Sequence, residues 1–351
     1  MRVAPLLRVT STASCTETSA VRDSGAKPRA ASASIFRDDK QRARFIAGVL
    51  SWLDAQIDFF DPPQEDAIAQ IPERIVPGRS RKAFGELGLA LRLAQRASQL
   101  REREEIRRLK RAWLRMSRER DIFFDARRRV HLVPLMAVAL TVCAALDQVP
   151  ESPLRSLQTV LDRHFLDRTE LAAHPKLDLK YYLDCLGLKH AFDNDAVLFR
   201  RSSLTNPAAI PYARRIDFYA ITHLIFHLSD FAARDMQPIC GRHFDGIREY
   251  LALALATSLT ERDFDLAGEF LIARLCLGVR DDALNRAACD VLCEIQQPAG
   301  FIPDQAWLAG LKPRDDPRQR AEEEFFAVYH PTLVALILAA CDLSLPFEMN
   351  S

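Results

Sequence analysis

Glycine is scarce in this sequence, with 12 residues in a chain of 351. The tight turns of an all-β protein depend on glycine, so its scarcity argues against that class. Ala, Leu and Arg, which favour helices, are abundant instead. No alternating apolar and polar run is long enough to predict a strand. The sequence therefore predicts an all-α fold.

The motifs of several enzyme classes are also absent. There is no G-x-G-x-x-G, no phosphate-binding G-x-x-x-x-G-K-[ST] and no G-x-S-x-G. Dinucleotide, P-loop and serine-hydrolase chemistry therefore have no support in the sequence. The 8 cysteines are scattered without a C-x-x-C pair, which favours reduced core residues. We predict no metal site, and the sequence identifies no cofactor.

Long apolar runs, which would indicate a membrane span, are missing too. The closest is residues 130–146, which is shorter than the ~18 residues of a span and contains His131 and Pro134. We expect a buried core helix there and no membrane contact. Residues 1–35 are rich in Ser, Ala, Thr and Arg and lack the apolar region of a secretory signal. We predict a disordered leader and a cytoplasmic protein, with a transit peptide as the alternative for this segment.

From Arg37 onward, apolar residues recur at helical spacing, and short linkers with Pro or Gly separate the helices. Helices joined in this way pack as antiparallel neighbours, in a solenoid of helix pairs or a closed α/α toroid. A solenoid would show a repeat period, and none is found. We predict helical hairpins that close into an α/α toroid over residues 151–351, after an N-terminal helical region over residues 36–150.

Charge is unevenly distributed, although the formal net charge is only +1. Residues 74–129 hold 18 Lys or Arg against 7 Asp or Glu. Glutamates interleave with the basic residues from Arg101 to Arg129, and no aromatic ladder accompanies them, so nucleic-acid binding is disfavoured. This segment is either a solvated helix face or a docking surface for an acidic protein partner.

One helix carries a polar stripe of unusual composition. On a helix, Tyr219, His223, His227 and Asp230 share one face, opposite an apolar face. If this stripe faces a cavity, Tyr219, His223 and Asp230 are candidate catalytic residues, and His227 is a candidate ligand contact. If it faces water, the helix is an ordinary amphipathic one.

Two further places carry candidate site residues. His330 precedes Pro331, and proline favours the first helical turn, so we expect His330 at a helix entrance beside Tyr329. His330 is a candidate catalytic residue and Tyr329 a candidate ligand contact; a cap or core contact is the alternative for His330. Asp265 and Glu269, four residues apart, are candidate ligand-binding carboxylates, or else part of a hydrated helix face.

The segment around the polar stripe resembles a bacterial family. Residues 222–231 fit T-H-x-x-F-x-L-x-D-F, which resembles the signature of an uncharacterised family common in actinobacteria. Residues 181–188, which end in Leu-Gly-Leu, and residues 329–334 fit the same family. The resemblance covers roughly the C-terminal half of the chain. It implies a role in bacterial specialised (natural-product) metabolism.

A more distant likeness is to the α/α-toroid proteins of the terpene cyclase and prenyltransferase type. It rests on Tyr329-His330 and on the Gln-rich turn at residues 296–301. The D-x-D-D acid motif and the Asp-x-Cys pair of the prenyltransferase zinc site are absent. The likeness therefore implies a fold and no activity. We carry two functions forward: a cavity protein that binds a small molecule or peptide, and a non-catalytic accessory protein that docks an acidic partner.

Overall fold

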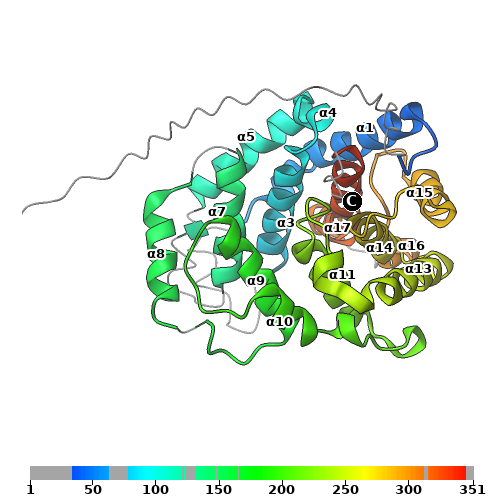
Figure 1. Cartoon of the computed structure of the whole chain (residues 1–351). Helices are drawn as coiled ribbons and strands as arrows, with labels where there is room; N and C mark the ends of the chain where they lie inside the picture. Colours follow the sequence, from blue (N-terminus) through cyan, green and yellow to red (C-terminus); the bar gives the residue numbers. More distant parts are fainter. Residues whose placement is uncertain are drawn as a thin grey trace, which may run out of the picture. The chain divides into compact units, whose positions relative to one another are not determined.

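The secondary structure of the described residues is entirely helical, which confirms the predicted all-α class (Figure 1). This computed structural model describes residues 34–62, 78–120, 122–123, 132–146, 149–164, 166–311 and 315–344. They belong to one structural unit, Ser32–Ser351, and the other unit, Met1–Ala31, lies outside the described residues.

The predicted leader lies outside the described residues except for its last two, Ser34 and Ile35. Those two belong to the fold. Ile35 is fully buried, and its backbone N–H donates to Asp342 over 3.1 Å. Ser34 donates to the same carboxylate over 2.8 Å. The predicted boundary at residue 35 is therefore too late, because burial of Ile35 and hydrogen bonds to Asp342 already hold residues 34 and 35 in the fold.

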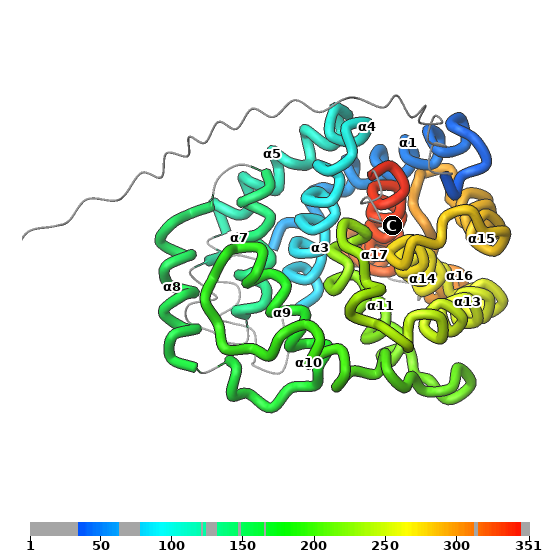
Figure 2. Tube along the Cα trace, in the orientation of Figure 1, coloured from blue at the N-terminus to red at the C-terminus, as the bar shows by residue number. Residues whose placement is uncertain are grey.

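Within the described part of the chain, six helices surround a cavity, each in contact with the next and the last in contact with the first. We call them the cavity helices. In chain order they are α3 (Gly78–Ala94), α7 (Val133–Leu146), α9 (Ala173–Cys185), α11 (Arg215–Leu228), α14 (Phe264–Cys276) and α17 (Pro317–Leu343). Figure 2 shows α17, in red, beside α3 and α14.

Other helices pack against the cavity helices. They are α1 (Asp39–Ala55), which contacts α17 and α5; α5 (Glu104–Glu119), which contacts α3; α8 (Glu151–Leu161), on α7; α10 (Asp195–Arg200), on α9; α13 (Phe244–Thr260), on α14; and α15 (Ala283–Ile295), on α13 and α14. The remaining described elements are short: α4 (Ser98–Arg101), α12 (Gln237–Cys240), α16 (Gln305–Leu308), η1 (Ile57–Phe60), η3 (Ser203–Thr205), η4 (Ile210–Tyr212) and η5 (Gly241–His243).

These contacts cross the domain boundary that we predicted at residue 150. α3 packs against α17, and α7 packs against α9. Two of the cavity helices thus come from the N-terminal region. Residues 36–150 and 151–351 are therefore parts of one unit, because neither set alone surrounds the cavity.

α14 is buried along its whole length, from Phe264 to Cys276. A helix buried on all sides is expected to be apolar all round, yet α14 contains Asp265, Glu269 and Arg274. Buried charges are costly unless neighbouring groups compensate them. Our alternative of a hydrated face for Asp265 and Glu269 is therefore wrong, and their partners on other helices become important.

α17 runs from Pro317 to Leu343 with Pro331 inside it. We expected Pro331 to begin a helix with His330 at its entrance, and this expectation is wrong. An internal proline costs ~3 kcal/mol or more through a lost hydrogen bond and a clash. Here Pro331 is itself buried, and the helix around it packs on α1, α3 and α14, which offsets that cost. His330 consequently lies in the middle of α17.

By length and composition, α17 could also cross a membrane. Our prediction that residues 130–146 come closest to a membrane span is therefore wrong, because α17 continues through Pro331. Of its most apolar window, 78% is buried inside the fold, as in the core helix of a soluble protein. The absence of membrane contact remains a prediction.

The Gln-rich turn at residues 296–301 joins α15 to the surface of α1. The Gln296 side-chain amide donates to the backbone oxygens of Phe45 (3.0 Å) and Gly300 (2.9 Å). Gly300 has a φ of 104°, and a Cβ atom there would lie 2.0 Å from the carbonyl oxygen of Gly48. Only glycine fits this close approach of two backbones.

We predict that Gly300→Ala lowers the free energy of unfolding by ~3 kcal/mol or more, because backbone strain and the clash with α1 add together. Gly310→Ala is the matched control, since Gly310 also has a positive φ, 88°, but an added Cβ would meet nothing within 4 Å. It should cost only ~1 kcal/mol. Urea denaturation followed by circular dichroism compares the two, and equal losses would contradict the close approach.

Candidate functional site

The cavity helices enclose a cavity of about 400 Å³. Small-molecule sites typically measure ~300–1,000 Å³. Each cavity helix contributes an apolar side chain to its wall: Leu89, Leu135, Leu179, Phe226, Ile272 and Leu333. The polar groups of the wall are Glu86, Asp178, Tyr182, His223, His227, Glu269 and His330. The cavity is therefore mostly apolar, with a concentrated set of ionisable groups.

Glu269 lies at the centre of these polar groups and is only 2% exposed. Thr222 donates a hydrogen bond to its Oε2. Its Oε1 lies 3.3 Å from Nε2 of His330 and 3.9 Å from Nε2 of His223. Burial alone would raise the pKa of Glu269, but the hydrogen bonds and charges of the two histidines outweigh burial and hold the pKa far below its usual value. Glu269 is therefore a buried carboxylate anion.

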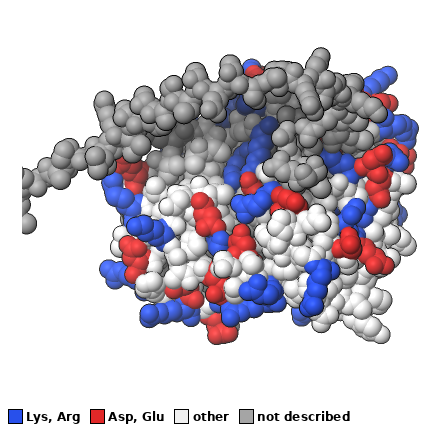
Figure 3. All heavy atoms as spheres, in the orientation of Figure 1, with Lys and Arg blue, Asp and Glu red and all other residues white. Residues whose placement is uncertain are grey.

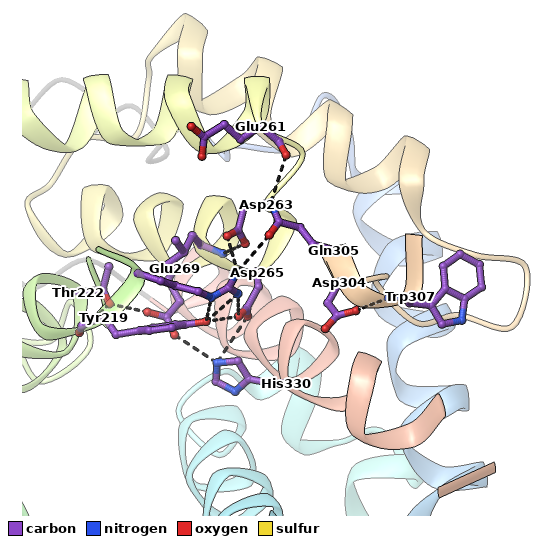
Figure 4. A network of polar contacts seen from close by, with 12 residues as sticks. Tyr219, Thr222, Glu261, Asp263, Asp265, Glu269, Asp304, Gln305, Trp307 and His330 are labelled. Atoms are coloured by element: carbon purple, nitrogen blue, oxygen red, sulfur yellow. Dashed lines mark hydrogen bonds and ion pairs between the residues drawn. The ribbon is translucent and has the colours of Figure 1, made fainter. Parts of the chain in front are cut away.

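His330 projects from α17 toward Glu269 and Asp265 (Figure 4), and it also contacts Glu86. Its Nδ1 lies 3.2 Å from Glu86, and its Nε2 lies 3.3 Å from Glu269 and 3.5 Å from Asp265. Burial lowers the pKa of His330, yet the carboxylates outweigh it and raise the pKa well above the usual value. His330 is thus a fixed imidazolium cation at neutral pH, with both ring nitrogens engaged.

His223 is the more open of the two histidines that contact Glu269. Its side chain is 39% accessible and lines the cavity. Burial lowers the pKa of His223, but Glu269, with a contribution from Asp178, raises the pKa to about 8. The structure therefore brings His223 and His330 together around one carboxylate. His223 faces the cavity with a proton that it holds at neutral pH and releases in mild base.

His227 is buried and also lies in the cavity wall. Its Nδ1 lies 2.6 Å from Asp178, and its Nε2 lies 3.5 Å from the hydroxyl of Tyr182. Burial would raise the pKa of Asp178, but the His227 charge outweighs it and lowers the pKa. The carboxylate that orients a histidine of the polar stripe is therefore Asp178 of α9, and it is not Asp230.

Asp230 lies outside the cavity wall because α11 ends before it, at Leu228. Asp230 has a φ of 47°, and Phe231 and Ala232 follow it in the same left-handed region. Its Oδ1 accepts from Arg96 and from Tyr181, each over 2.6 Å. Our placement of Asp230 on the stripe beside His223 is thus wrong, since the chain leaves the helix first. Asp230 thus anchors the end of α11 to Arg96, just after α3, and to Tyr181 of α9.

Tyr219 and Asp265 lie behind His330 and do not line the cavity (Figure 4). Tyr219 donates to Asp265 Oδ2, and Arg215 donates to the same oxygen over 2.8 Å. Burial, followed by the charge of Asp265, raises the pKa of Tyr219 far above its usual value, so this phenol stays protonated. Both residues hold the His330 cluster in place, a role different from the ligand contacts that we expected.

Tyr329 is likewise set back from the cavity. Its ring stacks on Phe325, 5.3 Å between centroids, and meets Phe60 edge-on. A hydrogen bond from Tyr329 contributes to the lowered pKa of Glu86, although burial alone would raise that pKa and His330 is the largest lowering influence. Tyr329 therefore orients Glu86 and does not contact the cavity itself.

A family model for a domain of unknown function, DUF6895, matches residues 46–340. The chain belongs to the DUF6895 family. The match includes all six cavity helices except the last residues of α17. No curated protein and no solved structure matches the chain. Membership in DUF6895 confirms that the chain belongs to an uncharacterised family, while the T-H-x-x-F-x-L-x-D-F signature and the toroid likeness remain predictions. The family brings no activity with it.

Sequence reasoning missed two carboxylates of this DUF6895 chain, Glu86 and Asp178. Glu86 could have been identified from the sequence, because it is the single acidic residue of α3, a helix otherwise made of apolar, small and basic residues. The sequence alone does not distinguish Asp178 from Asp184, which lies on the same helix. Asp184 contacts Lys180 and His190 and lies outside the cavity wall. Among the described residues, no group of three or more His, Cys, Asp or Glu is arranged to hold a metal ion.

The described part of the basic segment, Arg101 to Arg120, is largely paired within the fold, whereas residues 121 and 124–129 lie outside the described residues. Arg108 contacts Asp54 over 2.7 Å, Arg120 contacts Asp61, and Arg111 contacts Glu104 over 3.2 Å. Figure 3 shows positive and negative side chains intermingled on the visible face. Paired arginines offer less charge to an acidic partner, so no observation favours the docking function, which remains a prediction.

We predict that Asp230→Ala destabilises the fold by ~3 kcal/mol, because it leaves Arg96 and Tyr181 without their shared acceptor and places alanine in a left-handed conformation. Asp193→Ala is the matched control, since Asp193 forms an exposed pair with Arg201 (45% and 67% accessible side chains). It should change stability by less than ~0.5 kcal/mol. Chemical denaturation measures both, and a neutral Asp230→Ala would contradict the anchoring role.

Proposed function

We propose that this DUF6895 protein binds a small molecule, or one side chain or terminus of a peptide, in the cavity between its cavity helices. The observation that carries the proposal is the pairing of an apolar wall with one polar cluster, His223, Glu269 and His330. Natural ligand sites have this composition, in which apolar groups provide affinity and few polar groups fix orientation.

The cavity volume narrows the class of ligand. About 400 Å³ accommodates a compact organic molecule, whereas a folded or extended peptide requires more room. No Lys or Arg occurs among the described residues of the wall, while Glu86, Asp178 and Glu269 do. We therefore infer a ligand without a large negative charge, with its apolar part toward Phe226 and Ile272 and its polar group toward His223.

We further propose that the chain forms an α/α toroid. One support is that each cavity helix contacts the next one along the chain, and the last contacts the first. The other is that helices lining the cavity alternate along the chain with helices that pack outside them. In this proposal α3 and α7 belong to the inner ring, so the toroid begins before residue 151. A cytoplasmic location and a role in bacterial specialised metabolism stay proposals that rest on the sequence and its family resemblance.

The test uses N-phenyl-1-naphthylamine, a neutral apolar dye that fluoresces when it leaves water. We expect saturable binding of the dye to the full chain. Val138→Trp places a large ring in the cavity wall and should weaken binding by about tenfold or more, which corresponds to ~1.4 kcal/mol.

Leu253→Trp is the control for that variant, because Leu253 on α13 is 56% exposed and lies outside the cavity wall. It should bind the dye like the parent protein. Equal affinities of the parent and Val138→Trp would show that the dye binds elsewhere and would contradict the proposed cavity site.

A further inference from the structure

His223 differs from the other two histidines of the cavity in what its ring nitrogens contact. In His227 and His330, each ring nitrogen faces a partner. In His223, Nε2 faces Glu269 at 3.9 Å, and Nδ1 has no hydrogen-bond partner among the described residues. The ring is also 39% accessible, against 5% for the side chain of His227 and 20% for that of His330. Nε2 of His223 therefore has a carboxylate partner, and Nδ1 is available to a ligand.

An imidazole with a carboxylate at one nitrogen and an open second nitrogen is the arrangement through which histidine moves protons in enzymes. The carboxylate sets the ring orientation and stabilises the imidazolium. Here Glu269 is itself held by Thr222 and His330. The 3.9 Å separation between Nε2 of His223 and Oε1 of Glu269 is within the range of an ion pair.

The residue types in the wall favour proton transfer over covalent chemistry. Among the described residues that line the cavity there is no Ser, Thr, Cys or Lys, and the carboxylates Glu86, Asp178 and Glu269 are each paired with a histidine. The phenol of Tyr182 lines the cavity, and burial raises its pKa so that it stays protonated. The ring of Phe226 lies 6.0 Å from that of His223, and apolar neighbours of this kind strengthen the attraction between the Glu269 carboxylate and the imidazolium.

We propose that His223 acts as a general base and general acid on the molecule held in the cavity, and that this substrate is a compact, mostly apolar compound with a weakly acidic C–H bond. The inference rests on the proposed binding function. His223 takes the proton, and the C–H electron pair moves into the substrate toward an electron-withdrawing group. The imidazolium then returns the proton to another atom of the substrate, so no oxidant or second reactant is needed.

Charged and titratable groups surround His223 on several elements. They are Glu269 on α14, Asp178 and His174 on α9, His330 on α17, and Tyr219 and His227 on α11. Glu269 and Asp178 favour the imidazolium and His330 opposes it, with a net rise of the pKa to about 8 after burial has acted to lower it. The neutral base therefore becomes the main form above pH 8, and base-catalysed rates should rise through pH 8 and level off above it.

The test reaction is the ring opening of 5-nitrobenzisoxazole, an apolar bicycle that needs only a base. The base removes the C–H proton, the electron pair forms a nitrile, and the N–O bond breaks to give a yellow phenolate. We expect the full-length protein to accelerate this reaction with a pH–rate profile that has its midpoint near pH 8 and levels off above it. His223→Gln should reduce the rate by about 100-fold or more, within the usual contribution of a general base.

Two variants separate this role from a structural one. Glu269→Gln should move the midpoint of the pH–rate profile from about 8 toward 6.5, because the imidazolium loses its anionic partner. His243→Gln, in η5 and outside the cavity wall, should leave the rate and the profile unchanged. Circular dichroism and thermal unfolding show whether each variant is folded. If His223→Gln does not fold, the shift of the pH–rate midpoint in Glu269→Gln decides whether His223 is the base.

The binding of 5-nitroindazole, a bicycle of the same shape without the N–O bond, separates failure of catalysis from failure of binding. Binding of 5-nitroindazole supports the binding proposal whatever the rates. The catalytic inference is overturned if 5-nitroindazole binds and His223→Gln keeps the full elimination rate. It is also overturned if 5-nitroindazole binds and the pH–rate profile of folded Glu269→Gln does not move. If neither 5-nitroindazole nor N-phenyl-1-naphthylamine binds, the proposed binding function is overturned together with it.

Discussion

The negative charge of Glu269 lies inside α14, a helix with no exposed residue along its length. An isolated carboxylate in such a place would be protonated or would destabilise the fold by several kcal/mol. Its charge is kept because Thr222 and His223 approach from α11 and His330 approaches from α17. His330 in turn draws Glu86 from α3. One buried charge thus links four of the cavity helices within the described part of the chain.

The same constraint explains the rest of the network around α14. Asp265, one turn before Glu269, is neutralised by Arg215 and held by Tyr219. Arg274, near the other end of the helix, donates to Asn285 over 2.6 Å and contacts Asp282 over 2.9 Å. Every charge of α14 therefore has a partner from another element. These partners fix how the neighbouring helices pack, and they leave His223 as the member of the Glu269 cluster with the most accessible surface.

Much of the fold was predictable from local patterns, because helical periodicity, scarce glycine and short linkers act over a few residues. His223 and His330 were also predictable as candidate site residues, from the polar stripe of one helix and from the position of His330 before Pro331, but their meeting at Glu269 was not. Other features depend on contacts between distant segments. The sequence cannot show that burial keeps α17 continuous through Pro331, or that a left-handed turn removes Asp230 from the stripe. For the same reason the contributions of α3 and α9, Glu86 and Asp178, were missed.

Glu269 and the imidazole of His223 form one ionised pair at the cavity wall, on which the proposed chemistry depends. Nitrogen-15 NMR of histidine-labelled protein, titrated from pH 5 to pH 10, measures this pairing directly. We expect a pKa for His223 of about 8, and a pKa closer to 6.5 in Glu269→Gln. A His223 resonance that titrates near 6.5 in both proteins would disprove the ionised pair, because the carboxylate would then exert no influence on the imidazole.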